Sequence, residues 1–264
     1  MKILFVGRIL KDHFTNKTRI GGNVLNQAST LAKLIEPTSI HLISSVSPKD
    51  QDIFDYINEL KINFYNVETS TTPIIKYDKN NKVEEVNLYN LMQDFTKEKV
   101  SNFNNIIKEA SIIVCDLGNK EIVEHVIKTN PKAKLIIEPI SLHHVSDLNY
   151  NILNRTFLFK GNKDEVSKLT QIEIKNKEDC FKAVDCLKIM GVRRAFITLD
   201  KKGSYYFDEH VIGFKESKLV SQKTIVGAGD IFLAGIIYAL RITQDMDILA
   251  DYANRIFLKF YNKL

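Results

Sequence analysis

Residues 2–35 read KILFVGRILKDHFTNKTRIGGNVLNQASTLAKLI, and this stretch holds the pattern that decides the fold class. Its first part, KILFVG, is a continuous apolar run that ends in glycine, which is typical of a buried parallel strand. After a polar stretch, apolar residues recur at helical spacing, namely Val24, Leu25, Ala28, Leu31, Ala32 and Ile35. A buried strand followed by an amphipathic helix predicts the first unit of an α/β fold.

The rest of the chain alternates in the same way. Further strands are predicted at residues 39–46, 62–68, 111–117, 134–139, 156–161 and 194–200, with helices between them that include 94–110 and 142–153. Two hairpins are predicted, at 72–89 and 203–214. This order predicts a mostly parallel central sheet sandwiched by helices, in a single domain over residues 1–264. Ligands of such sheets bind beyond the carboxyl ends of the strands.

Composition places the chain among ordinary soluble globular proteins, since its 264 residues are 44% hydrophobic and 26% charged. The lysines behind its net charge of +5 are spread along the chain, which argues against a nucleic-acid partner. Three cysteines, Cys115, Cys180 and Cys186, have no metal-ligand spacing, and a reduced, cytoplasmic protein is expected. No apolar run suits a signal peptide or a membrane span, so no membrane partner is expected.

The segment KTIVGAGDIFLAGIIYAL, residues 223–240, places Gly227, Ala228, Gly229 and Asp230 where an apolar helix begins. A helix N-terminus attracts anions, and these small residues leave its amides open to a phosphate. Asp230 could then act as a general base that takes a proton from an attacking hydroxyl. Equally, it could be an ordinary first-turn acid favoured by the helix dipole. The segment alone does not decide between these readings.

Two further segments lie near the first predicted strand. In GGNVLNQA, residues 21–28, Gly22 begins a helix near the loop after the first strand, where glycine allows the backbone to lie close to a neighbouring group. Asn26 could offer a hydrogen-bond donor and an acceptor to a polyol. Asp12 could accept hydrogen bonds from ligand hydroxyls. The structural alternatives are a glycine turn with a solvated polar face and a solvated loop aspartate.

Asn162 and Glu165 follow a later strand, three residues apart on one helical face. They could orient hydrated magnesium and nucleotide phosphates, or they could simply form a capping box. In ITLDKKGSYYF, residues 197–207, Thr198 ends a strand and Gly203 lies in a turn. The sequence contains no Walker-type, dinucleotide, nucleophile-elbow or zinc pattern.

Taken in order, these segments resemble the motifs of the ribokinase/PfkB carbohydrate kinases over nearly the whole chain. GGNVLNQA is similar to the family's glycine-pair motif, NKDE to its N-x-x-E, TLDKKG to its T-x-G-x-x-G segment, and VGAGDIF to its C-terminal signature. The last match is the specific one. The resemblance implies a ribokinase-like fold with a small β lid, whose elements are expected near residues 8–20 and 68–90.

The resemblance also implies a role for each candidate residue. Asp230 would be the catalytic base, and residues 227–229 would form the anion hole for the transferred phosphoryl group. Substrate would be bound by Asp12, Gly22, Asn26 and Asp116, the last at the end of the strand predicted over 111–117. Nucleotide would be bound by Asn162, Glu165, Thr198, Gly203 and Asn254, with Glu165 also near magnesium through water.

Three departures from the family pattern bear on these roles. Thr224 and Ile225 stand where the signature usually has Asp-Thr, so the resemblance does not carry a monovalent-cation or metal role over to this position. Asp200 replaces a glycine of the nucleotide segment, so the backbone of that loop can differ. The chain ends one helix after the signature helix, which shortens the wall expected around the adenine at Asn254.

The sequence therefore predicts an ATP- and Mg²⁺-dependent kinase that phosphorylates a hydroxyl of a sugar or sugar-like small molecule. A nucleoside kinase is a second alternative, for which Phe14, Tyr77 and Tyr89 could supply stacking. A member that binds sugar or nucleotide without efficient phosphoryl transfer is a third. Such kinases often dimerise through the lid, so the resemblance makes a homodimer one possible state and leaves the oligomeric state open.

Overall fold

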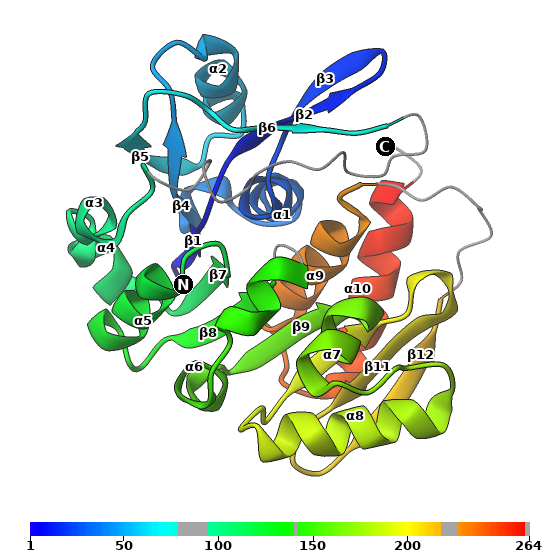
Figure 1. Ribbon diagram of the computed structural model, residues 1–264. Helices are drawn as coiled ribbons and strands as arrows, with labels where there is room; N and C mark the ends of the chain where they lie inside the picture. Colours follow the sequence, from blue (N-terminus) through cyan, green and yellow to red (C-terminus); the bar gives the residue numbers. More distant parts are fainter. Residues whose placement is uncertain (79–93, 140–141, 218–225, 262–264) are drawn as a thin grey trace. The chain divides into compact units, whose positions relative to one another are not determined.

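The structure, a computed structural model, describes residues 1–78, 94–139, 142–217 and 226–261 (Figure 1). The chain divides into two compact units. The first comprises residues 1–133 and 224–227, and the second comprises residues 134–223 and 228–264. The single domain expected over residues 1–264 stays a prediction.

The first unit is built on parallel strands in the order β7-β1-β4-β5. Their bounds are Ile3–Val6 (β1), Ile40–Val46 (β4), Asn63–Glu68 (β5) and Ile112–Asp116 (β7). In the register, Ile3 of β1 lies beside Ile40 and Ile112. Every residue of β1, β4 and β7 is buried, as is typical of parallel strands covered on both faces. The predicted strands at these positions are confirmed.

Helices flank these strands (Figure 1). They are α1 (Asn23–Ala32), α2 (Gln51–Glu59), α3 (Lys97–Ser101), α4 (Asn104–Glu109) and α5 (Lys120–Thr129), with a 3₁₀ turn η1 (Pro37–Ser39). Helix α1 packs on β1, β4 and β7, whereas α3 and α4 pack against α5. The structure divides the helix predicted over 94–110 into α3 and α4. Phe103 separates them, and its ring packs against Tyr65 with centroids 5.7 Å apart, so a tertiary contact accompanies the break.

A small sheet in the first unit contains β2 (Leu10–Phe14), β3 (Lys17–Gly21) and β6 (Ile74–Lys76), in the order β3-β2-β6. Strands β2 and β3 form an antiparallel hairpin, and β6 adds to β2 in parallel. Strands therefore occupy the parts of residues 8–20 and 68–78 where lid elements are expected. The remainder of the hairpin predicted over 72–89 lies outside the described residues.

The second unit has the strand order β12-β11-β10-β9-β8. Its strands are β8 (Lys134–Glu138), β9 (Leu158–Asn162), β10 (Ala195–Thr198), β11 (Gly203–Phe207) and β12 (Ile212–Glu216). Strands β8, β9 and β10 are parallel, while β11 and β12 form an antiparallel hairpin at one edge. The hairpin predicted over 203–214 is thereby confirmed. The carboxyl ends of β8, β9 and β10 carry the polar residues of interest.

The helices of the second unit are α6 (Tyr150–Arg155), α7 (Lys163–Thr170), α8 (Lys177–Ile189), α9 (Ala228–Ala239) and α10 (Met246–Tyr261), with 3₁₀ turns η3 (Leu142–Asp147) and η4 (Asp200–Lys202). Helix α7 packs on β9 and β10, and α10 packs on β11, β12 and α9 (Figure 1). The helix predicted over 142–153 is thus a 3₁₀ turn followed by α6. Helices α9 and α10 pack closely because Gly235 has no side chain: a Cβ there would lie 2.7 Å from the Cα of Ala253.

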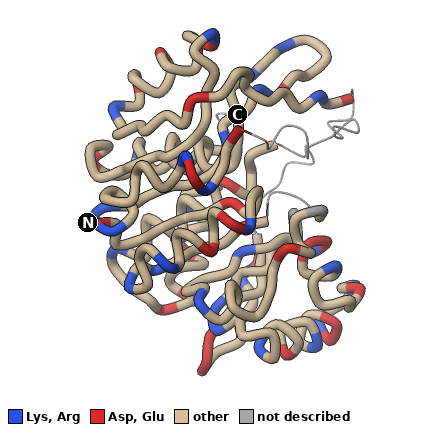
Figure 2. The backbone as a smooth tube through the Cα atoms, turned by 60° about the vertical axis from the view of Figure 1, so that its left-hand side comes forward, with Lys and Arg blue, Asp and Glu red and all other residues tan. Residues whose placement is uncertain are grey.

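Charged residues of both signs are interspersed along the described backbone (Figure 2). This distribution agrees with the spread of lysines in the sequence. Among the described residues, none of the helices combines the length and the apolar character that a membrane span requires.

Candidate active site

The start of α9 has the conformation that an anion-binding helix N-terminus needs. Gly227 adopts a positive φ of 92°, which favours glycine, and Ala228 is the first helical residue. Asp230 lies in the first turn and is 5% exposed. It is therefore a buried acid at a helix start, rather than a solvated one. Residues 224 and 225, where the sequence departs from the family signature, lie outside the described residues.

A buried ion pair lies beside this helix start within the second unit. The ammonium group of Lys160, on β9, donates a hydrogen bond to Glu138 at the end of β8, and each side chain is 5% exposed. A Cβ on Gly229 would lie 2.8 Å from the Lys160 Nζ, so the cation reaches the first turn of α9. Burial alone would lower the pKa of this amine, but the surrounding carboxylates, Glu138 first and then Glu165 and Asp230, raise it. The cation is therefore retained in the site.

Sequence reasoning missed this pair. Glu138 and Lys160 each end an apolar run, in KLIIEP and TFLFKG, and both runs were assigned simply as strands. A charged residue at the carboxyl end of each of two buried parallel strands was the available signal, because ligands of such sheets bind there.

Asn162 and Glu165 form the capping box that the sequence suggested. The Asn162 side chain accepts a hydrogen bond from the Glu165 amide (2.9 Å), and the Glu165 carboxylate accepts one from the Asn162 amide (2.8 Å). Glu165 is 6% exposed, and this burial raises its pKa to about 7 against the attraction of Lys160. The capping geometry is confirmed, whereas a role with nucleotide or metal stays a prediction.

The carboxylates of the second unit are better suited to binding a metal ion through water molecules than to ligating it directly. Within residues 1–78, 94–139, 142–217 and 226–261, no group of three or more His, Cys, Asp or Glu side chains is placed to hold a metal ion. Mg²⁺ usually keeps several waters and is held by one or two carboxylates together with substrate phosphates. A single acid such as Glu165, acting through water, fits that behaviour.

The remaining predicted nucleotide residues lie around the β10–β11 turn and on α10. Thr198 lies beside Asn162 in the register and donates a long hydrogen bond (3.5 Å) to the Gly161 carbonyl. Gly203 has a φ of 126°, and a Cβ there would lie 2.1 Å from the Lys215 carbonyl, so hairpin packing alone requires glycine. Asn254 is half-buried and donates to a β12 carbonyl at 3.4 Å. Their nucleotide roles stay predictions.

In the first unit, Asp12 is a buried strand residue rather than a solvated loop acid. It lies on β2, is 2% exposed, and accepts hydrogen bonds from Arg19 Nη2 (3.0 Å) and the Tyr77 hydroxyl (3.1 Å). The solvated-loop alternative is therefore wrong. Three strands of the small sheet meet at this carboxylate, because Arg19 comes from β3 and Tyr77 follows β6.

Gly22 is the N-cap of α1, with a φ of 105°. A Cβ there would lie 2.3 Å from the carbonyl oxygen of Arg8, so the close approach expected from the sequence is to the loop after β1. Asn26 lies one turn into the helix and is half-buried, and its amide donates to the Gly22 carbonyl at 2.9 Å.

Asp116 organises the same loop from the end of β7. It is 8% exposed, and its carboxylate accepts hydrogen bonds from the amides of Arg8 (2.8 Å) and Gly118 (3.3 Å). A Cβ on Gly7 would lie 2.1 Å from this carboxylate, so a larger residue there would displace the Asp116 side chain. The structure thus brings Asp116 and Gly22 to one loop, through Arg8, a residue that the sequence analysis did not single out.

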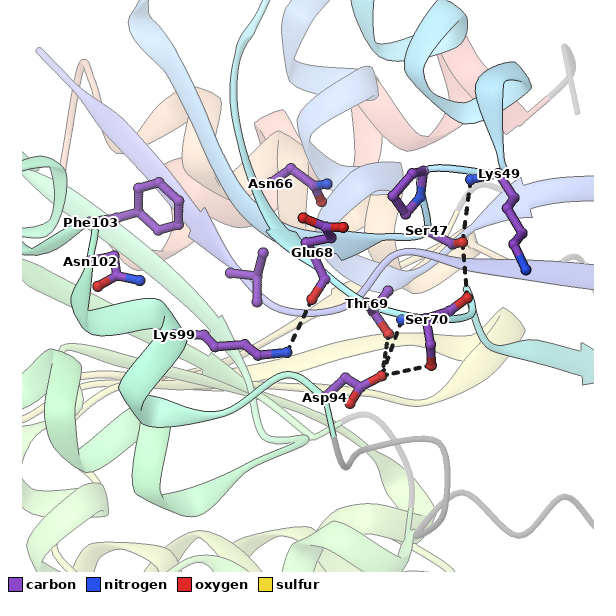
Figure 3. A pocket seen from close by; sticks show the side chains of 12 residues that line it. Ser47, Lys49, Asn66, Glu68, Thr69, Ser70, Asp94, Lys99, Asn102 and Phe103 are labelled. Atoms are coloured by element: carbon purple, nitrogen blue, oxygen red, sulfur yellow. Dashed lines mark hydrogen bonds between the residues drawn. The ribbon is translucent and has the colours of Figure 1, made fainter.

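A pocket of about 770 Å³ lies at the ends of β4 and β5, and none of the predicted site residues lines it (Figure 3). Asp94 accepts hydrogen bonds from the Thr69 hydroxyl (2.8 Å) and from the amide and hydroxyl of Ser70, and these bonds lower the pKa of its carboxyl. Lys99 donates to the Glu68 carbonyl at 3.1 Å. These groups bond one another and hold the loop after β5.

Comparison with known proteins gives a consistent result. The sequence model described as "pfkB family carbohydrate kinase" matches residues 6–256. The bifunctional protein HldE of Aliarcobacter butzleri is 26% identical over 256 residues, which cover 88% of this chain and 50% of HldE. The pseudouridine kinase of Escherichia coli is 23% identical over 153 residues, which cover 57% of this chain and 49% of that protein. The chain thus spans about half the length of the curated relatives it matches.

Among solved structures, the fold resembles an E. coli protein provisionally named ribokinase II, in complex with ATP and Mg²⁺. The TM-score is 0.79 at 17% identity, with 96% of this chain and 90% of that chain covered. The α/β class, with a large mostly parallel sheet flanked by helices, is therefore confirmed as ribokinase-like.

Proposed function

Since the chain belongs to the pfkB family of carbohydrate kinases, we propose that it transfers the γ-phosphoryl group of ATP to a hydroxyl of a sugar or sugar-like molecule. One observation carries the proposal: Asp230 is a buried acid in the first turn of α9, directly after Gly227, Ala228 and Gly229. A buried acid at a helix N-terminus combines a proton acceptor with amide groups that suit an anion.

In this mechanism, Asp230 takes the proton of the acceptor hydroxyl as its oxygen bonds to phosphorus and the bond to the leaving nucleotide oxygen breaks. The amides of residues 227–229 donate hydrogen bonds to the transferred phosphoryl oxygens. Lys160 holds positive charge beside Gly229, and Glu138 fixes its position. Bound ATP would supply the phosphoryl group and Mg²⁺ would neutralise its charge, and Glu165 would help to hold the ion through water.

Substrate recognition is assigned to the first unit, through Asp12, Gly22, Asn26 and Asp116. Nucleotide recognition is assigned to Asn162, Glu165, Thr198, Gly203 and Asn254. The small sheet β3-β2-β6 is proposed as the lid and as the surface of a homodimer, and the protein is proposed to act in the cytoplasm.

The test is single-turnover transfer from γ-labelled ATP to a panel of sugars. Asp230→Asn should slow transfer by about 10²- to 10⁴-fold while leaving the unfolding temperature and sugar binding nearly unchanged. The matched control is Asp52→Asn, which alters an exposed first-turn acid of α2 and should transfer at the wild-type rate. Near-normal transfer by Asp230→Asn would refute the mechanism.

A nucleoside acceptor is the second candidate, and the aromatic pair of the small sheet favours it. Phe14 and Tyr77 stack with centroids 4.7 Å apart and an interplanar angle of 13°, and Tyr77 also donates to Asp12. A base could extend this stack. Nucleosides in the same single-turnover panel separate the two acceptors, and binding without transfer by any of them would favour a non-catalytic member.

A further inference from the structure

Arg8 is a buried arginine, and two nitrogens of its side chain have no hydrogen-bond partner among the described residues. It lies two residues after the end of β1 and is 6% exposed. Its Nε and Nη2 atoms are buried and have no hydrogen-bond partner among the described residues. Its backbone amide donates a hydrogen bond to Asp116, and its backbone carbonyl packs against Gly22.

Burying these two nitrogens of Arg8 without hydrogen-bond partners destabilises the folded protein when no ligand is bound. Burial lowers the pKa of Arg8 to about 10, although the carboxylates of Asp116 and Asp94 act in the opposite direction. The group is still a cation at neutral pH. A buried cation without hydrogen-bonded partners destabilises the folded state, and native proteins pair such groups. A bound anion would supply the missing partner.

The chemistry of the partner follows from the donors. A guanidinium presents a planar fork of N–H groups, which matches two oxygens of a phosphate or carboxylate. One face of Arg8 is over the ring of Phe95, 5.8 Å from its centroid, so the N–H edges are the groups left for a ligand. The unused N–H donors of Arg8 are therefore suited to binding an oxyanion.

The position of Arg8 links this oxyanion to the acceptor. Arg8 lies at the carboxyl end of a parallel strand, where ligands of α/β sheets bind. It shares its loop with Gly22 and Asp116, two residues assigned to substrate. Arg19, the ion-pair partner of Asp12, also has a buried Nε without a partner. Two guanidinium groups of the first unit thus have unused donors.

We propose that Arg8 binds an anionic group of the acceptor, so that the preferred acceptor is a sugar already carrying a phosphate or a carboxylate. The assignment of this ligand as a phosphoryl acceptor rests on the proposed kinase function, whereas the binding of an anion at Arg8 does not. The product would then carry two anionic groups. A reaction that supplies a sugar phosphate or sugar acid must precede this enzyme.

Thermal unfolding at low ionic strength tests the anion site without knowledge of the natural acceptor. Wild type, Arg8→Met, Arg8→Lys and the exposed control Arg193→Met are compared with and without inorganic phosphate. Phosphate should stabilise wild type and Arg193→Met by ~2 °C or more, Arg8→Lys less, and Arg8→Met not at all. Without phosphate, Arg8→Met should unfold at or above the wild-type temperature, because a buried unpaired cation is gone.

Matched ligands then identify the anion: a hexose, its monophosphate and its uronate, with the equivalent pentose set. The phosphate or the carboxylate member should show an Arg8-dependent gain over the neutral sugar. A phosphate shift that is absent from wild type, or that persists in Arg8→Met, overturns the proposal. If Arg8→Met does not fold, Arg8→Lys and Arg8→Gln decide it by the same comparison.

The same samples separate this proposal from the kinase function. Asp230→Asn should lose phosphoryl transfer but keep the Arg8-dependent phosphate shift. A wild-type protein that shows the shift without transferring phosphate to any acceptor would contradict the kinase function and leave the anion site standing. Transfer to neutral sugars at rates equal to their phosphates and acids, unchanged in Arg8→Met, would contradict the anionic acceptor alone.

Discussion

Lys160 donates a hydrogen bond to Glu138 in the interior of the second unit, and only 5% of either side chain is exposed. The two residues come from neighbouring parallel strands, β9 and β8. Glu138 is the main source of negative charge around the Lys160 ammonium group, with Glu165 and Asp230 adding to it, and Gly229 leaves the room that the ammonium group occupies.

The first prediction is that Glu138→Gln will be strongly destabilising. Removing one partner of a buried ion pair leaves an uncompensated charge, so the free energy of unfolding should fall by about 3–5 kcal/mol in urea denaturation. The matched control is Glu109→Gln, which breaks the exposed ion pair of Glu109 with Lys2 and should change stability little.

The double variant Glu138→Gln with Lys160→Met completes the cycle. Removal of the second charge should restore much of the lost stability, because the coupling between the two residues carries the effect. If the losses in unfolding free energy caused by Glu138→Gln and by Lys160→Met simply add in the double variant, the ion pair is not the source of the destabilisation.

The second prediction concerns pH and Glu165. Burial raises its folded-state pKa from 4.5 to about 7, so between these values the folded protein holds more protons than the unfolded chain. The contribution of Glu165 to stability is therefore present in full below pH 4.5 and is lost as the pH rises to about 7. Glu165→Gln should match wild type at pH 5 and exceed it at pH 8, by at most ~3 kcal/mol.

Thermal and urea unfolding of both proteins across this pH range measure the difference. Gln can still accept the hydrogen bond from the Asn162 amide, so capping is retained. A constant gap between the two curves from pH 5 to pH 8 would show that Glu165 does not titrate in this window.

The third prediction contrasts two glycines of α9. In Gly229→Ala, the new Cβ meets the end of the Lys160 side chain at 2.8 Å, and that side chain can shift. In Gly235→Ala, it meets the Cα of Ala253 at 2.7 Å, and backbone yields less readily. Gly235→Ala should therefore lower stability by about 1–3 kcal/mol, and Gly229→Ala by less. Equal losses in urea denaturation would contradict this packing account.

A further contrast appears in activity. Gly229→Ala displaces the Lys160 ammonium group and should reduce phosphoryl transfer more than its stability loss explains. Gly235→Ala should keep the wild-type rate when assayed well below its unfolding temperature.

The fourth prediction is that Gly22→Ala will destabilise the first unit. The backbone at Gly22 has a φ of 105° and a ψ of 133°, and a Cβ would lie 2.3 Å from the Arg8 carbonyl. Strain of this kind costs about 1–3 kcal/mol, and the clash adds to it. Urea denaturation measures the loss, with Ser29→Ala in the same helix as a control of small effect. A loss no larger than that of the control would show that the loop after β1 can move away.

Local patterns predicted much of the fold. Apolar runs such as KILFVG and SIIVCDL form buried strands, and the N-x-x-E spacing forms a capping box, because each depends on residues a few positions apart. The helix predicted over 94–110 was less accurate, since the contact of Phe103 with Tyr65 joins residues far apart in the chain. The family and the acid at the start of α9 were also predicted from the sequence.

What the sequence by itself determined is the order of strands and helices, the family, and which side chains are chemically able to act. Only the tertiary structure decided that Lys160 is paired with Glu138 and that Asp12 is buried between Arg19 and Tyr77. It also decided that two buried nitrogens of Arg8 have no hydrogen-bond partner in the described part of the chain. The physical reason is desolvation. Whether a charge is paired, strained or open to a ligand depends on what covers it, and those neighbours come from distant parts of the chain.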